Sequence, residues 1–132
     1  FLSSSDETGA DLFVSERRSL LVCFQGHPEY EAPTLLKEYR RDIGRYLRGE
    51  QPAWPTLPHG YFTPAALELI ETFRRRAEPA RDPGLLAEFP LAILAAGLEP
   101  RWQPGAAAIY RNWLEYVAVA RERTRRPAAA GL

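Results

Sequence analysis

A continuously apolar run, Leu20 to Phe24, is the feature that most restricts what this chain can fold into. A strand with one wet face alternates apolar and polar residues, whereas a strand covered on both faces of an α/β sheet is apolar throughout. A second β-prone run, 11–14, precedes it, and the polar segment 15–18 between the two runs, a serine followed by three charged residues, predicts a hairpin. The small polar residues 3–9 predict a loop. We therefore expect an α/β fold with a buried strand at 20–24.

Helical periodicity begins soon after this strand, at 31–34, and continues to Arg48, just before Gly49. At about 100° per residue, the apolar residues of this stretch fill one arc of roughly 120°. They are Leu35, Leu36, Tyr39, Ile43, Tyr46 and Leu47, and the residues opposite them are Lys37, Glu38, Arg41 and Arg45. The pattern predicts a helix that packs by one face and leaves the other face polar.

Prolines mark the rest of the chain, because nine of the twelve lie between 49 and 104. This stretch is expected to be an irregular connection with inserted helices. Thr63-Pro64 is typical of a helix cap and first position, and Asp82-Pro83 repeats that signal. The predicted helices of this part are 64–76, one that starts at 83, and 106–124; the apolar run 91–96 fits a helix or a buried strand, and a helix is preferred. The aromatic residues expected at the edge of the core are Trp54, Tyr61, Phe62 and Trp102.

The length and charge of the chain limit the number of domains and the kinds of partner that we expect. A chain of 132 residues is long enough for one core and too short for two full-sized domains. We predict one domain, 1–132, made of the strands and helix of 1–48, the connection 49–104 and the final helix and tail 105–132. Since 17 basic residues face 17 acidic ones, no nucleic-acid partner is expected. No apolar run approaches the roughly 18 residues that span a membrane.

Cysteine and methionine usage give two further expectations. Cys23 is the only cysteine, which excludes a disulfide framework and favours a reducing compartment, the cytoplasm. The two histidines, His27 and His59, lack the convergent ligands of a metal site, so no metal is expected. The sequence has no methionine and begins Phe1-Leu2-Ser3. Either processing removed the initiator or, as we prefer, the chain is the carboxyl-terminal portion of a longer polypeptide.

His27-Pro28-Glu29 follows the predicted strand directly and is the main candidate for chemistry. Side chains two residues apart on an extended backbone project to the same side, so the Glu29 carboxylate can orient the His27 imidazole. Such a pair is the base and its orienting group in a catalytic triad. The alternative is a loop histidine beside a surface carboxylate, because short motifs often match by chance.

Four segments together resemble the carboxyl-terminal half of the homoserine O-acyltransferases, the homoserine O-succinyltransferase family of methionine biosynthesis. They are 24–31 (FQGHPEYE), 34–35 (TL), 37–42 (KEYRRD) and 110–116 (YRNWLEY). The resemblance implies a class I glutamine amidotransferase-like fold, flavodoxin-like and three-layered, with additional carboxyl-terminal helices. Because amidotransferases of that class also carry His-Pro-Glu after a strand, the segments 37–42 and 110–116 are what favour the acyltransferase.

The resemblance also implies a mechanism. A cysteine takes an acyl group from acyl-CoA, succinyl-CoA in the preferred interpretation, and the hydroxyl of L-homoserine then attacks the thioester. By position, His27 matches the general base, Glu29 its carboxylate partner, and Arg41 the residue that binds the homoserine carboxylate. No cofactor beyond the acyl-CoA co-substrate is implied, and we expect a homodimer. For Arg41 the alternative is a solvated arginine paired with Glu38 or Asp42.

Cys23 is predicted to pack in the core rather than to act as the nucleophile. It lies in the middle of the apolar run, and a buried apolar cysteine is inert. The nucleophile and the acyl-CoA contacts are then expected on an absent amino-terminal part, and residues 1–132 alone should be inactive. Two other functions stay open: a glutamine amidotransferase domain, and a catalytically silent assembly domain that keeps the motif as structure.

Overall fold

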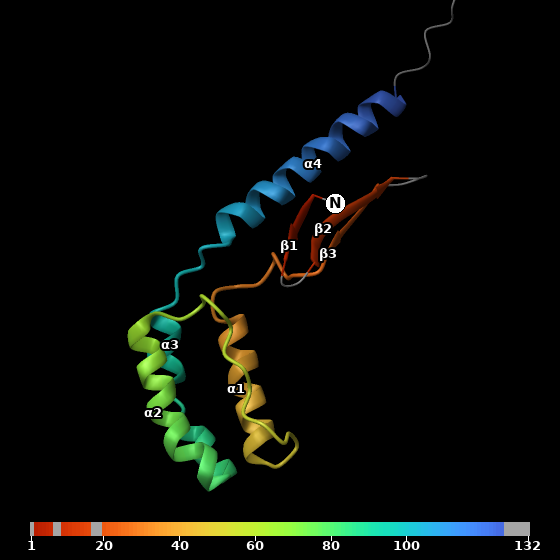
Figure 1. The fold of residues 1–132 in the computed structure, drawn as a ribbon. Coiled ribbons are helices and arrows are strands. Elements are labelled where there is room, and N and C mark those ends of the chain that lie inside the picture. Colours follow the sequence, from red (N-terminus) through yellow and green to blue (C-terminus); the bar gives the residue numbers. More distant parts are fainter. Residues whose placement is uncertain (1, 7–8, 17–19, 126–132) are drawn as a thin grey trace, which may run out of the picture. The chain divides into compact units, whose positions relative to one another are not determined.

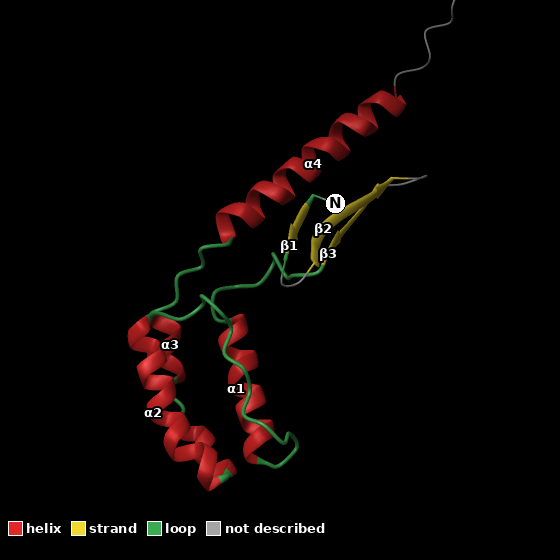
Figure 2. Ribbon diagram, in the orientation of Figure 1, coloured by secondary structure: helices red, strands yellow, loops and turns green. Residues whose placement is uncertain are grey.

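The computed structural model describes residues 2–6, 9–16 and 20–125. They form two compact units, one made of 1–29 with 101–132 and the other of 30–100. The first unit holds three strands and a long helix, and the second holds the remaining helices (Figures 1 and 2). Strands and helices in one chain confirm the α/β class; that 1–132 is one domain stays a prediction.

The sheet of the first unit is antiparallel, in the order β1-β2-β3. Its strands are β1 (Ser3–Ser5), β2 (Gly9–Glu16) and β3 (Leu20–Phe24). The pairing of β2 with β3 confirms the predicted hairpin, although residues 17–19 of its turn lie outside the described residues. The loop predicted at 3–9 is wrong for Ser3–Ser5, because backbone hydrogen bonding to β2 makes a strand there from residues of low β propensity.

The expectation that β3 is covered on both faces is also wrong for the described residues. Pairing sets Phe13 opposite Cys23 and Ser15 opposite Leu21, so these four share one face of the sheet. On that face Leu21 is 59% exposed and Phe13 is 38% exposed. The apolar run therefore forms a strand of a small antiparallel sheet with one accessible face.

The long helix α4 (Gln103–Arg125) packs on the other face of the sheet. The rings of Phe24 and Tyr110 lie 6.3 Å apart, and the hydroxyl of Tyr116 donates a 3.3 Å hydrogen bond to Glu16. The predicted helix at 106–124 is confirmed, with an earlier start. Among residues 2–6, 9–16 and 20–125, no helix combines the length and the apolar character that a membrane span requires.

The helical unit is built on α1 (Thr34–Leu47), which confirms the predicted amphipathic helix. Most of the predicted arc is buried, with Leu36 and Ile43 fully so. Gly44 also lies on the packed face, where an added Cβ would approach Leu86 Cδ2 to 2.8 Å. Glycine therefore lets the chain around Leu86 come close to this turn of the helix.

Three further elements complete the unit: α2 (Pro64–Ala80), the short 3₁₀ helix η1 (Pro83–Glu88) and α3 (Leu91–Ala96). The predicted caps are present, since Thr63 accepts a hydrogen bond from the Ala66 amide and Asp82 from the Gly84 amide. The predicted end of α2 at Arg76 is wrong, because Ala77 is buried in the core and Arg74 pairs with Glu78 at 2.8 Å. These contacts carry the helix one turn further.

The hydrophobic core lies within 30–100. Aromatic rings make up much of it: the ring centroids of Phe73 and Phe89 are 5.3 Å apart, and those of Tyr46 and Trp54 are 5.2 Å apart. The prediction that aromatic residues of the connection cover the core edge is confirmed for Trp54, Tyr61 and Phe62. Trp102 is the exception, because it belongs to the other unit and lines a cavity there.

Candidate functional site

His27 and Glu29 form a hydrogen-bonded pair just beyond the end of β3. His27 Nδ1 lies 2.8 Å from Glu29 Oε1, and the two side chains are 58% and 56% exposed. With Nδ1 engaged by the carboxylate, proton transfer by the ring falls to Nε2. The pairing predicted from the spacing is therefore confirmed as geometry, and the catalytic roles stay proposals.

The local chain explains why the pair sits outside the sheet. The Gln25 amide donates a 2.8 Å hydrogen bond to the Asp11 carbonyl, which continues the β2–β3 pairing past Phe24. Pro28 has no amide hydrogen, so the ladder cannot extend through it. The backbone turns at Pro28 and Glu29, and both functional side chains are left at the strand end.

The hydrogen bond from His27 lowers the pKa of Glu29 below its ordinary value, with a smaller contribution from a backbone hydrogen bond. The carboxylate therefore stays ionised over a wider pH range than a free glutamate. An ionised acceptor on Nδ1 fixes the imidazole tautomer and stabilises an imidazolium when Nε2 takes a proton. Because both groups are exposed, the pair contributes orientation rather than stability.

His27 borders a cavity of about 340 Å³ within the first unit. The wall combines apolar side chains with two polar groups, Ser3 and Asp11, whose side chains are hydrogen-bonded to each other at 3.2 Å. The lining residues are Ser3, Asp11, Leu12, Phe24, Gly26, His27, Pro28, Trp102 and Ile109. A cavity that joins a general-base candidate to a few polar groups on apolar walls is typical of a small-ligand site.

No pattern in the sequence pointed to Ser3 or Asp11 in this cavity. Both come from strands whose register brings them beside the end of β3, and register is a tertiary property. Trp102 was expected at a core edge and instead lines the same cavity. An acidic residue, Asp11, in a short β-prone run was the only feature of the sequence that could have suggested a role for this position. Such a residue does not by itself indicate a binding site.

Arg41 lies on the polar face of α1, in the helical unit, whereas His27 belongs to the other unit. Its guanidinium makes a two-pronged contact with Asp42, at 2.9 Å from Nε to Oδ1 and 3.2 Å from the terminal nitrogen to Oδ2. This contact raises the pKa of Arg41. One of the two predicted surface pairings, with Asp42, is thus present, and the role of Arg41 toward a substrate stays a prediction.

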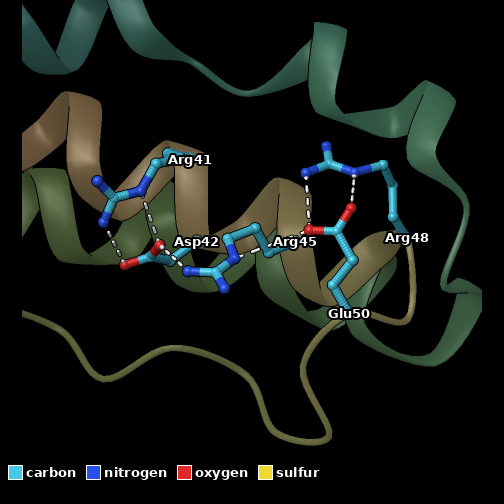
Figure 3. A network of polar contacts seen from close by, with 5 residues as sticks. All are labelled: Arg41, Asp42, Arg45, Arg48 and Glu50. Atoms are coloured by element: carbon cyan, nitrogen blue, oxygen red, sulfur yellow. Dashed lines mark hydrogen bonds and ion pairs between the residues drawn. The ribbon is translucent and has the colours of Figure 1, made fainter.

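Figure 3 shows that Arg41 belongs to a row of alternating charges along α1 and the turn that follows it. Asp42 also lies 3.9 Å from Arg45, which in turn lies 3.7 Å from Glu50. Arg48 closes the row with contacts of 2.6 and 3.2 Å to Glu50, which lower the pKa of that carboxyl. Arg41 stands at the end of this row, 58% exposed.

The remaining candidates do not gather into a second site. Cys23 was expected in the core but is only half-buried, opposite Phe13 on the accessible face of the sheet. His59 is exposed in the connection before α2. Across 2–6, 9–16 and 20–125, no three His, Cys, Asp or Glu side chains come together in a way that could hold a metal ion.

Comparison with known proteins gives a consistent result. Residues 1–124 match the family described as homoserine O-succinyltransferase. Proteins named homoserine O-succinyltransferase from Methylorubrum extorquens and Bradyrhizobium japonicum are 44% and 43% identical, each over 89% of this chain, and one from Rhodopseudomonas palustris is 42% identical over 86%. The chain spans 35%, 35% and 34% of those three proteins, about a third of their length. No solved structure matches it.

Proposed function

The chain belongs to the homoserine O-succinyltransferase family, and we propose that the protein transfers an acyl group from acyl-CoA to the hydroxyl of L-homoserine. The observation that supports this most is the His27–Glu29 pair at the strand end, with its 2.8 Å hydrogen bond and its cavity. The family match favours this function over a glutamine amidotransferase. The exposure of His27 also argues against a silent domain that keeps the motif as buried structure.

In the proposed reaction, His27 Nε2 removes the proton of a cysteine thiol while sulfur attacks the acyl-CoA carbonyl. Coenzyme A leaves as a thiol after taking that proton, and a thioester remains. The homoserine hydroxyl then gives its proton to Nε2 as its oxygen attacks the thioester, and the cysteine recovers the proton when the O-acyl product leaves. Each positioned proton transfer contributes about 10²- to 10⁴-fold to the rate.

We place the nucleophilic thiol outside residues 1–132. Cys23 is the only cysteine of the sequence, and it lies in the middle of β3, half-buried, where no strand-to-helix turn presents it. Residues 1–132 by themselves would then carry the base and its partner but not the group that is acylated. That the enzyme is a cytoplasmic homodimer, with succinyl-CoA as donor and no further cofactor, is part of the same proposal.

Arg41 is the proposed ligand of the homoserine carboxylate. Two of the five guanidinium donors point to Asp42, which leaves donors for a second planar carboxylate. Asp42 would then hold the Arg41 guanidinium in one orientation and leave its remaining donors accessible to the substrate. The support for this role is the match of 37–42 to the family pattern together with the exposure of the side chain.

The direct test is His27→Ala in the full-length enzyme. We expect kcat/KM to fall at least a hundredfold, because the proton acceptor is lost. The melting temperature should hardly change, since the side chain is 58% exposed and outside the core. Release of free CoA thiol measures activity, and circular dichroism follows melting.

His59→Ala is the matched control, since it removes the other histidine from an exposed loop. Its activity should equal that of the wild type. If His27→Ala keeps more than about a tenth of wild-type kcat/KM, then His27 is not the base. If the wild-type protein itself releases no CoA thiol with homoserine, the acyltransferase function is wrong.

A further inference from the structure

We propose that Asp11 recognises the ammonium group of the amino-acid acceptor. This inference rests on the proposed function, in which the cavity beside His27 receives homoserine. It assigns a role to a residue of β2 that the sequence pattern did not single out. Three features of the structure carry it: a break in the sheet register, the hydrogen bond of Asp11 to Ser3, and the uncompensated charge of Asp11 within the cavity.

Asp11 is the extra residue of a β-bulge. Ser3 pairs with Leu12 and Ser4 pairs with Ala10, so β2 advances two residues where β1 advances one. A bulge bends its strand and changes the direction of the extra side chain, and bulges are frequent beside functional sites. Here the break falls on Asp11, the acidic residue among the described residues that line the His27 cavity.

Two contacts hold Asp11 at the cavity wall. The Ser3 hydroxyl donates a 3.2 Å hydrogen bond to Oδ2. Oδ1 lies beside Gly26, where an added Cβ would stand 3.4 Å from it. Since Gly26 directly precedes His27, the carboxylate on β2 and the imidazole in the loop after β3 border the same small space. Oδ2 of Asp11 thus accepts a hydrogen bond from the neutral Ser3 hydroxyl. Oδ1 lies beside the backbone of Gly26, the residue before His27.

The charge of Asp11 has no cationic partner within the described part of the chain. Its neighbours in the cavity wall are mostly apolar, among them Leu12, Phe24 and Trp102. Asp11 is itself exposed, so a cation in solution can reach its carboxylate and form a charge-assisted hydrogen bond with it. Homoserine carries one cationic group, its ammonium, at the end of the molecule opposite the hydroxyl that His27 would deprotonate.

The acceptor can thus be positioned by two groups of one cavity. His27 would take the hydroxyl proton and Asp11 would bind the ammonium, which fixes the direction of the four-carbon chain. A hydroxy acid without the amino group would lose the Asp11 contact and keep the His27 contact. Asp11 is accordingly a specificity residue for amino-acid acceptors and has no part in the first half-reaction with acyl-CoA.

The experiment compares homoserine with 4-hydroxybutanoate, which lacks only the ammonium, as acceptors for the full-length enzyme. In Asp11→Asn the amide keeps an oxygen for the Ser3 hydroxyl and loses the charge. We expect kcat/KM for homoserine to fall about ten- to a hundredfold, the scale of one charge-assisted contact. The value for 4-hydroxybutanoate should change less than about twofold, and formation of the acyl-enzyme should proceed at the wild-type rate.

Two further variants make the result specific. Asp11→Glu keeps the charge and should retain part of the preference for homoserine. Glu16→Gln is the matched control, because Glu16 lies on the same strand, contacts Tyr116 and does not line the cavity. The preference of this variant for homoserine over 4-hydroxybutanoate should equal that of the wild type. The unchanged rate of acyl-enzyme formation also shows that a variant is folded.

The proposal would be overturned if the ratio of kcat/KM for homoserine to kcat/KM for 4-hydroxybutanoate were the same in Asp11→Asn as in the wild type. If both values fell by the same factor, Asp11 would have a structural role. The wild-type enzyme decides the proposed function separately. If it acylates homoserine, the variants report on Asp11 alone; if it does not, the acyltransferase function and the role of Asp11 both fail.

Discussion

Glu29 contacts His27 through two side chains that are both more than half exposed, so water competes for each of them. The hydrogen bond nevertheless lowers the pKa of Glu29. A lowered carboxyl pKa means that the folded state favours the ionised form. This preference for the carboxylate is fully present above the ordinary pKa of 4.5 and is lost as the pH falls through the lowered pKa, and because both groups are exposed it adds little to the stability of the fold.

The first prediction concerns this titration. In the wild type, the Glu29 carboxyl should titrate below 4.5, and in His27→Ala its midpoint should rise toward 4.5, because the main cause of the shift is removed. Carbon-13 NMR of the side-chain carboxyl measures both midpoints. His59→Ala should leave the Glu29 midpoint in place; an equal midpoint in wild type and His27→Ala would show that the pair is not formed in solution.

Arg41 gives a second prediction at the residue scale. Arg41→Ala should lower kcat/KM for homoserine about ten- to a hundredfold, and Arg41→Lys should restore little, since an ammonium does not reproduce the planar fork. Loading of the enzyme from acyl-CoA should stay at the wild-type rate. Steady-state kinetics against each substrate separately measures both effects.

Arg45→Ala is the control for Arg41, because Arg45 is an exposed arginine one turn along α1 that faces the same Asp42. Arg45→Ala should not alter kcat/KM for homoserine. If Arg41→Ala also leaves kcat/KM for homoserine unchanged, Arg41 is a solvated arginine paired with Asp42.

Among the elements, α2 ends in an unusual way. Arg81, its C-cap residue, has φ 46° and ψ 40°, the left-handed conformation that normally favours glycine. Its side chain holds it there: Nε donates a 3.1 Å hydrogen bond to the Tyr46 hydroxyl, and a terminal nitrogen donates a 3.0 Å one to the Pro52 carbonyl. The guanidinium also lies over the Tyr46 ring, 4.5 Å from its centroid.

The third prediction follows from this balance of strain and contacts. Arg81→Ala should lower the free energy of unfolding by about 1–2 kcal/mol, since the hydrogen bonds are lost and the strain remains. Arg81→Gly should be more stable than Arg81→Ala by roughly 1 kcal/mol, because glycine adopts this conformation without strain. Urea unfolding measures the difference. Arg75→Ala, at an exposed position of the same helix, should stay within about 0.5 kcal/mol of the wild type.

At the scale of the whole molecule, stability is unevenly distributed. The cluster of buried residues lies entirely within 30–100, whereas in the described residues of the other unit only Ala106 counts as buried. Burial of apolar surface is the main favourable contribution to folding. The helical unit therefore has what an independently folding segment needs.

The fourth prediction is that residues 30–100 fold without the rest. The isolated segment should be helical and should unfold cooperatively on heating, followed by far-UV circular dichroism. Within it, Ile70→Ala should cost about 2–5 kcal/mol, because Ile70 is fully buried. Leu69→Ala, at a 40% exposed neighbouring position, is the control and should cost much less. A gradual, non-cooperative melt would show that the helical unit depends on the strands.

The elements whose signals are local were predictable from the amino-acid sequence. Periodicity fixed the packed face of α1, Thr63 and Asp82 marked helix starts, and the paired β-prone runs gave the β2–β3 hairpin. The sequence also brought His27 and Glu29 together, since two residues on one strand end need no distant partner. Caps, side-chain period and turn residues act within a few positions of the chain, which is why they can be read without a structure.

Features that depend on distant partners in the chain became visible only in the folded structure. Ser3–Ser5 became a strand through backbone bonds to β2, α2 continued past Arg76 because Ala77 is buried, and the apolar run of β3 kept one accessible face. The bulge that brings Asp11 to the cavity of His27 belongs to the same group. Strand register and burial are set by the sum of contacts between segments far apart in the chain, and no local pattern at Asp11 encodes them.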